Sequence, residues 1–256
     1  YSNFFFDQLN QFNHLFGFSP IIWQKVALPL GISFFTFHGI SYLVDIYRKK
    51  SHETNLIDFA LYIALFPQLI AGPIIRFHEI AAEIKTRTHS YEKFFDGIFI
   101  FSYGLGMKVI LANPLGQTKA LLASQPNPTA LMLWLSTICY AFQIYFDFAG
   151  YSAMARGLGR MIGFDIPINF NRPYLAKSIT EFWQRWHISL LKFLREYVYF
   201  PLGGSRVSLL KNCRNILIVF LLSGIWHGAN WTFIFWGVYF GVIIVLEKIF
   251  EKPLTK

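Results

Sequence analysis

Residues 216–246 form an uninterrupted stretch without any Asp, Glu, Lys or Arg. One helix over this stretch would be about 46 Å long at about 1.5 Å per residue. That length exceeds the ~30 Å of hydrocarbon that an untilted helix crosses. Gly224, Gly228 and Asn230 lie inside the stretch, so we expect two helical elements with a break around residues 226–228. A chain with such a stretch is expected to fold in a lipid bilayer.

The composition agrees with a membrane protein and excludes an ordinary water-soluble domain. Hydrophobic residues make up 54% of the chain and charged residues 14%, against roughly 25% charged in soluble domains. The mean hydropathy is +0.41. The net charge is +9, but its basic residues stand in short clusters beside apolar runs, as in residues 48–50. This placement favours lipid headgroups and cytoplasmic loops, and we expect no nucleic-acid partner.

Four further apolar runs, at 26–44, 57–75, 94–111 and 129–148, approach the ~20 residues that cross a bilayer. Residues 113–128 contain three prolines and predict a loop, and the polar segment 156–181 predicts a surface or re-entrant element. We therefore expect an all-α, multi-pass helical bundle that forms a single domain over residues 1–256. The chain starts at Tyr1 without a signal-peptide pattern, and we expect it to be the central fragment of a longer protein.

Residues 181–199 predict an amphipathic helix that lies at the membrane interface or packs on the bundle. Charged side chains such as Glu181 and Arg185 fall on one side of a helical wheel. Aromatic and aliphatic side chains fall on the other, and His187 lies among them.

Ionisable groups inside apolar spans are the first candidates for a site, because they are costly there without a function. His227 lies in the longest uncharged run, and its neighbours Gly224 and Gly228 would let a substrate approach. An imidazole kept neutral by an apolar environment can accept a proton at pH 7. A structural histidine that is hydrogen-bonded between helices explains its position equally well.

Other polar residues are weaker candidates. Asp147 would orient an imidazole or pair with an arginine, or it simply ends a helix at the interface. Asn171 and Arg172, next to Asn169, would bind an anionic or carbonyl group, although a polar loop is the simpler interpretation. His187 alone is more often a packing residue. We expect His38 to be structural, and four histidines in polar segments to be solvated: His14, His52, His78 and His89.

Several known chemistries lack their sequence patterns here. The chain has no Walker-type phosphate loop, no Gly-x-Ser-x-Gly elbow and no His-Glu-x-x-His. Its two cysteines, Cys139 and Cys213, form neither a disulfide framework nor a metal-ligand spacing. We expect no metal and no bound cofactor.

Motifs along most of the chain carry a family resemblance. They are LPLGISFFTF at 28–37, SYLVDIYR at 41–48, FPQLIAGP at 66–73, YFDFAGYS at 145–152, NFNRPY at 169–174, FWQRWHISL at 182–190, YFPLGGSR at 199–206 and SGIWHGA at 223–229. In this order they resemble the membrane-bound O-acyltransferase family, and within it the bacterial alginate O-acetyltransferase group. Members of the family are about twice as long as this chain.

The resemblance implies a function and its residues. A multi-helix fold with a central tunnel would transfer an acyl group, expected to be acetyl, from a cytoplasmic thioester such as acetyl-CoA to a hydroxyl across the bacterial inner membrane. The acceptor would be an exopolysaccharide or cell-wall polymer such as alginate, or a periplasmic or extracellular acetyltransferase partner. His227 matches the family's invariant histidine, His187 a second motif histidine and Asp147 the aspartate of the subgroup. The residues expected to bind substrate are Trp226, Asn171, Arg172 and Trp186.

Three alternatives remain at this point. D-alanyl transfer to teichoic acid from a carrier protein shares the Trp-His-Gly element. A transporter would use His227, His187 and Asp147 as a proton relay, but the inverted repeats of many transporters are not evident. A non-catalytic membrane scaffold is the third.

Overall fold

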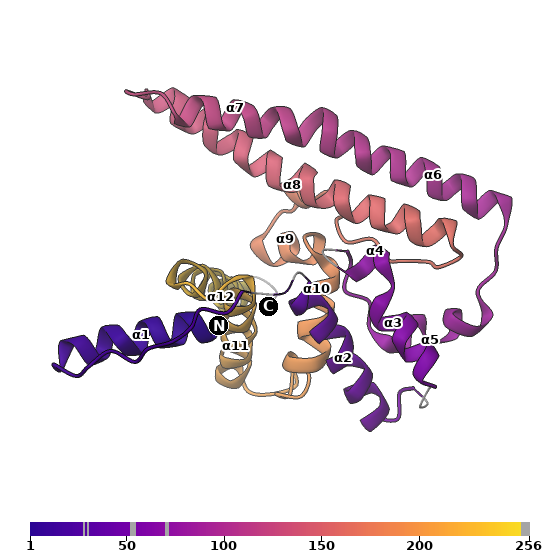
Figure 1. Cartoon of the computed structure of the whole chain (residues 1–256), viewed down its shortest axis with the longest axis horizontal. Helices are drawn as coiled ribbons and strands as arrows, with labels where there is room; N and C mark the ends of the chain where they lie inside the picture. Colours follow the sequence, from indigo (N-terminus) through magenta and orange to yellow (C-terminus); the bar gives the residue numbers. More distant parts are fainter. Residues whose placement is uncertain (28, 30, 52–54, 70–71, 252–256) are drawn as a thin grey trace. The chain divides into compact units, whose positions relative to one another are not determined.

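The computed structural model describes the chain except residues 28, 30, 52–54, 70–71 and 252–256, and every regular element in this described part is a helix (Figure 1). In chain order the elements are α1 Ser2–Leu15, α2 Ile32–Tyr47, α3 Leu56–Ala64, α4 Phe66–Leu69, α5 Phe77–Thr86, α6 Tyr91–Gly106, the π-helix η1 Met107–Ala112, α7 Asn113–Ala123, α8 Ala130–Met161, the 3₁₀ turn η2 Pro173–Leu175, α9 Ile179–Arg185, α10 Ile188–Leu194, the π-helix η3 Arg195–Tyr199, α11 Leu209–His227 and α12 Trp231–Glu251. The all-α prediction is confirmed.

The chain divides into two compact units. Unit 1 contains Tyr1–Ser33, Ala176–Phe182 and Leu191–Lys256, and unit 2 contains Phe34–Leu175 and Trp183–Leu190. The candidate site residues are divided between them, with His227 and Trp226 in unit 1 and the others in unit 2. The prediction of a single domain stays a prediction.

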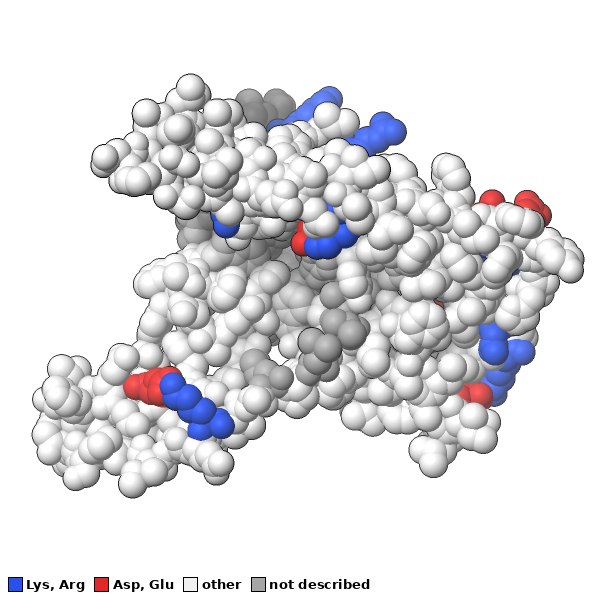
Figure 2. All heavy atoms as spheres, turned by 45° about the horizontal axis from the view of Figure 1, so that its top comes forward, with Lys and Arg blue, Asp and Glu red and all other residues white. Residues whose placement is uncertain are grey.

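Among the described residues, four helices are long and apolar enough to cross a membrane: Tyr91–Ala123, Ala130–Met161, Leu209–His227 and Trp231–Phe250. Much of their surface is apolar and exposed, as at Phe99, Trp134 and Phe235. Figure 2 shows the same character, since Lys, Arg, Asp and Glu gather in a few small groups on a face that is otherwise uncharged. Apolar surface of this extent requires a lipid environment or a protein partner.

The two longest spans of unit 2 lie side by side (Figure 1). Small residues let their backbones touch: a Cβ added at Gly104 would lie 2.5 Å from the carbonyl oxygen of Gly150, and one at Gly97 would lie 2.7 Å from that of Gly157. Close approach through small residues is the usual way in which helices associate inside a membrane. These four glycines therefore fix how α6 packs on α8.

The predicted run at 94–111 lies within the first span, and the run at 129–148 begins at the N-cap of the second, but both helices extend further. The predicted loop at 113–128 is wrong over its first part, because Asn113–Ala123 is the helix α7. Pro114, which has no backbone N–H, is the second residue after the π-helix η1. A π-turn tolerates such a disruption of the hydrogen-bond ladder, so the helix continues through the proline.

The predicted run at 57–75 does not form one helix. Helix α3 ends at Ala64, Leu65 is extended, and α4 is a single turn. This region instead forms a packed core around Tyr62 and Phe77, with these partners: Leu65, Ile75, Ile80, Ile84, Phe164 and Ile166. For the run at 26–44, α2 begins at Ile32, and positions 28 and 30 lie outside the described residues.

In unit 1, α11 and α12 pack against each other, and the predicted break at 226–228 is confirmed. Helix α11 ends at His227 and α12 begins at Trp231. A Cβ at Gly224 would lie 2.3 Å from the carbonyl oxygen of Phe233, and one at Gly228 would lie 2.7 Å from the ring of the same residue. Both glycines thus make room for α12, and the prediction that they let a substrate approach His227 stays a prediction.

Candidate functional site

His187 lies at a break in the predicted amphipathic helix. Helix α9 ends at Arg185 and α10 begins at Ile188, so a continuous helix over 181–199 is wrong. The backbone of His187 has φ +45°, the left-handed region that a non-glycine residue rarely occupies. Hydrogen bonds with an adjacent segment hold this conformation: Ile188 N–H donates to the carbonyl oxygen of Asn169 and Asn171 N–H to that of Arg185, both at 2.9 Å.

The Asn169 side chain fixes the tautomer of this imidazole. Ser189 N–H lies 2.9 Å from Asn169 Oδ1, and because a backbone N–H only donates, that atom must be the amide oxygen. His187 Nδ1 lies 3.3 Å from the same oxygen, so Nδ1 must carry the proton. The lone pair of the neutral ring is then on Nε2, where the imidazole can accept a proton or a hydrogen bond.

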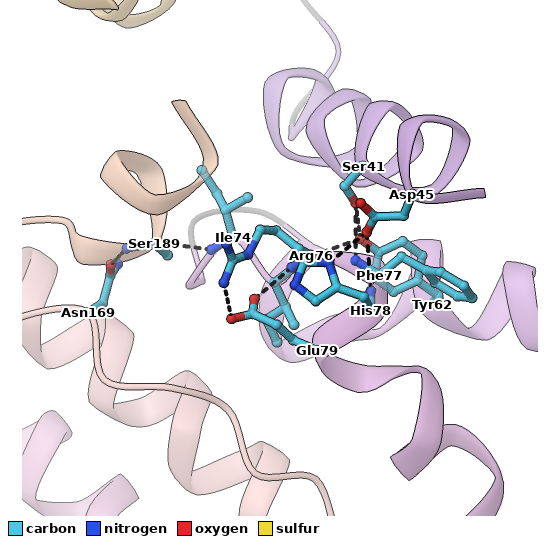
Figure 3. Close-up of polar contacts among 11 residues, drawn as sticks. Ser41, Asp45, Tyr62, Ile74, Arg76, Phe77, His78, Glu79, Asn169 and Ser189 are labelled. Atoms are coloured by element: carbon cyan, nitrogen blue, oxygen red, sulfur yellow. Dashed lines mark hydrogen bonds and ion pairs between the residues drawn. The ribbon is translucent and has the colours of Figure 1, made fainter. Parts of the chain in front are cut away.

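This arrangement is buried and anchored to a third segment. His187, Asn169 and Ser189 are only 2–4% exposed. Ser189 Oγ accepts a hydrogen bond of 2.9 Å from the backbone N–H of Ile74, so the extended segment after α4 is tied to α10 (Figure 3). Three segments that are far apart in the sequence therefore position one imidazole.

Aromatic rings surround the same place. The Phe148 ring meets the His187 ring edge-on at 4.8 Å, and the Phe170 ring stacks on it at 6.5 Å. Trp186 contacts the rings of Tyr145 and Tyr174 at 6.1 and 6.4 Å. Trp186, predicted to bind substrate, is thus a member of an aromatic cluster beside His187.

Two other predicted residues, Asn171 and Arg172, lie on the segment that holds His187. The carbonyl oxygen of Asn171 accepts a hydrogen bond of 3.4 Å from the Arg185 guanidinium. Arg172 has φ +46° and is exposed. Both line a cavity of about 280 Å³ together with Asn169. Unit 2 therefore brings His187, Trp186, Asn171 and Arg172 into one neighbourhood.

Asp147 is placed differently, because its carboxylate pairs with Lys108. The Lys108 Nζ and Asp147 Oδ1 atoms are 2.5 Å apart, between η1 and α8. The sequence analysis did not single out Lys108, although a cation inside the apolar run at 94–111 by itself indicates a partner or a function. The prediction that Asp147 orients a catalytic group stays a prediction, and its observed partner is this lysine.

In unit 1, His227 is the exposed last residue of α11. The rings of Trp226, Phe233 and Trp236 surround its imidazole at 4.9, 6.2 and 4.9 Å. Its ring nitrogens hydrogen-bond to no other residue in the described part of the chain. The interpretation as a histidine bonded between helices is therefore not supported within these residues.

The segment after His227 borders a wide groove of unit 1. This groove has a volume of about 1100 Å³ between α1 and residues 229–231. Tyr1 donates a hydrogen bond of 3.1 Å to the carbonyl oxygen of Trp226, and Trp231 Nε1 donates one of 2.9 Å to Gln8 Oε1. Two backbone N–H groups at the break are already used in the turn, since Gly228 donates to Ile225 and Asn230 to Gly228.

A second polar cluster in unit 2 was not predicted. Asp45 is fully buried, and its Oδ2 lies 2.8 Å from His78 Nδ1, so the prediction that His78 is solvated is wrong (Figure 3). The Tyr62 hydroxyl donates to the carbonyl oxygen of Ile75 at 2.8 Å and lies 2.7 Å from Ser41 Oγ. Burial raises the pKa of Tyr62 well above its usual range. These contacts fix the position of residues 74–78. Through the hydrogen bond from Ile74 N–H to Ser189 Oγ, they also fix Ser189.

The remaining histidines take different places. His38 is fully buried, and its ring nitrogens have no partner within the described ranges. Its ring lies 5.4 Å from that of Tyr62. His52 lies outside the described residues.

The fold and these two histidine sites define a multi-pass helical membrane protein with polar centres beside its apolar helices. The model of the membrane-bound O-acyltransferase family matches residues 32–254. The chain belongs to this family.

Named relatives add detail. The chain is 47% identical over 97% of its length to the probable alginate O-acetylase AlgI of Pseudomonas aeruginosa, of which it covers 48%. It is 38% identical over its full length to the peptidoglycan O-acetyltransferase of Helicobacter pylori, of which it covers 53%. It is 30% identical over 87% of its length to the teichoic acid D-alanyltransferase of Bacillus subtilis, of which it covers 60%. The chain therefore spans about half the length of the first two relatives.

Proposed function

We propose that this chain is the reactive part of an O-acyltransferase of the bacterial inner membrane. It would move an acetyl group from a cytoplasmic thioester such as acetyl-CoA to an exopolysaccharide or cell-wall polymer, directly or through an extracytoplasmic acetyltransferase partner. Membership in the acyltransferase family and the names of the relatives support this proposal.

One observation carries the proposal: His227 ends an apolar helix with an exposed imidazole that no described residue hydrogen-bonds. A hydroxyl is a weak nucleophile at neutral pH. A neutral imidazole that takes its proton makes it reactive toward a thioester carbonyl. The hydroxyl oxygen then forms the ester bond, the carbon–sulfur bond breaks, and the thiolate leaves and takes up a proton.

The other predicted residues would support this step. His187, with its lone pair on Nε2, would position the donor or the acceptor. Asn171, Arg172, Trp186 and Trp226 would contact substrate, and Asp147 would act together with Lys108.

Transfer of D-alanine is the second candidate, because the chain is also similar to teichoic acid D-alanyltransferases. Membranes that contain the complete polypeptide would be incubated with acetyl-CoA labelled in the acetyl group, and in parallel with labelled D-alanine on a carrier protein. The proposal predicts labelled polymer or labelled partner only from the acetyl donor. Label from D-alanine alone would favour the second candidate, and label from neither would favour a non-catalytic scaffold.

A further inference from the structure

The cavity of about 280 Å³ in unit 2 has an unusual set of polar side chains. It lies between α6, η1, α8 and residues 168–172. The polar residues that line it include two arginines, one serine and two asparagines: Arg156, Arg172, Ser152, Asn169 and Asn171. No Asp or Glu is among its described lining residues.

The two guanidinium groups have no acidic partner there. Neither Arg156 nor Arg172 takes part in an ion pair within the described part of the chain. The Nε atom of Arg156 donates to the carbonyl oxygen of Ile166 at 3.2 Å, which orients the guanidinium and leaves its two terminal NH₂ groups for another acceptor. Two cations that share a small cavity repel each other, and an anion between them removes this cost.

Two buried neutral groups point to the same ligand. Ser152 and Asn169 are each 2% exposed, and Ser152 Oγ and Asn169 Nδ2 have no hydrogen-bond partner within the described ranges. The Ser189 N–H fixes the Asn169 amide so that the unsatisfied atom is the NH₂ donor. Buried polar groups are normally hydrogen-bonded, so an unsatisfied donor beside two arginines indicates a missing acceptor.

We propose that this cavity binds the phosphate group of a phosphate ester. Four donor groups from α8 and the segment 169–172 surround one space, which suits a tetrahedral anion with several oxygens. The volume lies near the lower limit of small-molecule sites, so the cavity takes a phosphate and the atoms next to it. The rings of Tyr103 and Phe170 also line the cavity and would cover the organic part.

Two kinds of molecule could supply the bound phosphate group. The phosphates of a nucleotide-linked thioester donor are the first source, and in that form the inference rests on the proposed function. The headgroup of an anionic phospholipid is the second, because α6 and α8 lie in helices that are long and apolar enough to cross a membrane.

Binding of inorganic pyrophosphate to the complete polypeptide in lipid nanodiscs, measured by calorimetry, tests the site without turnover. Compared with wild type, Arg156→Gln and Arg172→Gln should each bind about tenfold or more weakly, since each removes a charge-assisted hydrogen bond. Arg172→Lys keeps the charge and should keep most of the affinity. Arg206→Gln removes an equal charge from an exposed loop and should bind like wild type. Failure of wild type to bind, or equal affinity in all variants, would overturn the proposal.

Two further measurements distinguish the sources. If the donor supplies the phosphate, Arg156→Gln raises the KM for acetyl-CoA about tenfold or more and leaves that for S-acetylpantetheine, which has no phosphate, unchanged. If a lipid supplies it, Arg156→Gln loses co-purified phosphatidylglycerol with both KM values unchanged. Pyrophosphate binding without any acyl transfer by wild type would refute the proposed function and leave the phosphate site standing.

Discussion

Removing the Asn169 side chain should disturb His187, because the Asn169 amide oxygen accepts the hydrogen bond from its imidazole. In Asn169→Ala, two buried donors lose their acceptor: Ser189 N–H at 2.9 Å and His187 Nδ1–H at 3.3 Å. Each orphaned buried donor costs about 1–3 kcal/mol, so the free energy of unfolding should fall by about 2–6 kcal/mol. The imidazole can then change tautomer and rotate. Loss of the partner that orients a functional imidazole typically costs about 10- to 100-fold in activity.

Asn169→Asp separates orientation from stability, because a carboxylate oxygen still accepts both hydrogen bonds. Its negative charge favours the protonated imidazole, so the acid limb of the pH–rate profile should move to higher pH while most of the activity remains at the new optimum. The assay is acetyl transfer by membranes with matched protein amounts, and Asn113→Ala, on the exposed start of α7, is the control. Wild-type activity and an unchanged pH profile in both Asn169 variants would refute the positioning of His187 by this amide.

Three other changes test the packing and the charges. Gly104→Ala should lower the free energy of unfolding by about 1–3 kcal/mol, because its Cβ would meet the backbone of α8. In the control Gly106→Ala, the added Cβ meets nothing closer than 4.0 Å and should not destabilise. Equal effects of the two variants would contradict the close contact between the helices. Burial would raise the pKa of Glu79, but hydrogen bonds from the side chain and the backbone N–H of Arg76 hold this pKa below 4.5. The ionised Glu79 carboxylate therefore contributes its full stabilisation above about pH 4.5, and this contribution is lost as the pH falls further. Glu79→Gln should make the free energy of unfolding depend less on pH in this range. A pH dependence parallel to that of wild type would exclude the effect. Asp147→Asn should destabilise the protein because it leaves Lys108 unpaired, and the double variant Asp147→Asn with Lys108→Met should regain stability. If activity also returns in the double variant, Asp147 has a structural role only.

The chain reveals its helical spans and the break at 226–228 directly, because both depend on local composition. Uncharged runs of sufficient length specify helices in a bilayer, and a polar residue and glycines within one run are enough to mark a break. Membership of the family was predicted correctly from motifs, since their order along the chain is itself sequence information.

Other features depend on which segments meet in space. The left-handed backbone of His187 is imposed by hydrogen bonds with residues 169–171, so a helical wheel over 181–199 cannot show it. The close packing of α12 on Gly224 and Gly228 also depends on a contact with Phe233 that the local sequence does not show. The pair of Asp45 and His78 joins residues that are 33 positions apart, and no local pattern marks such a contact.

Lys108 is a different case, because the sequence contained the signal. A lysine inside an apolar run is expensive unless it has a partner or a function, and the structure supplies that partner in Asp147. The same rule that singled out His227 therefore also identifies Lys108.

The most direct test of the account is acetyl transfer by the complete polypeptide with His227→Ala. The variant should reach the membrane in normal amounts, because no described residue hydrogen-bonds the imidazole, and its transfer of label from acetyl-CoA should fall by a factor of about 100 or more. Acetylation at the wild-type rate in membranes that contain equal amounts of this variant would contradict the assignment of His227 as the base.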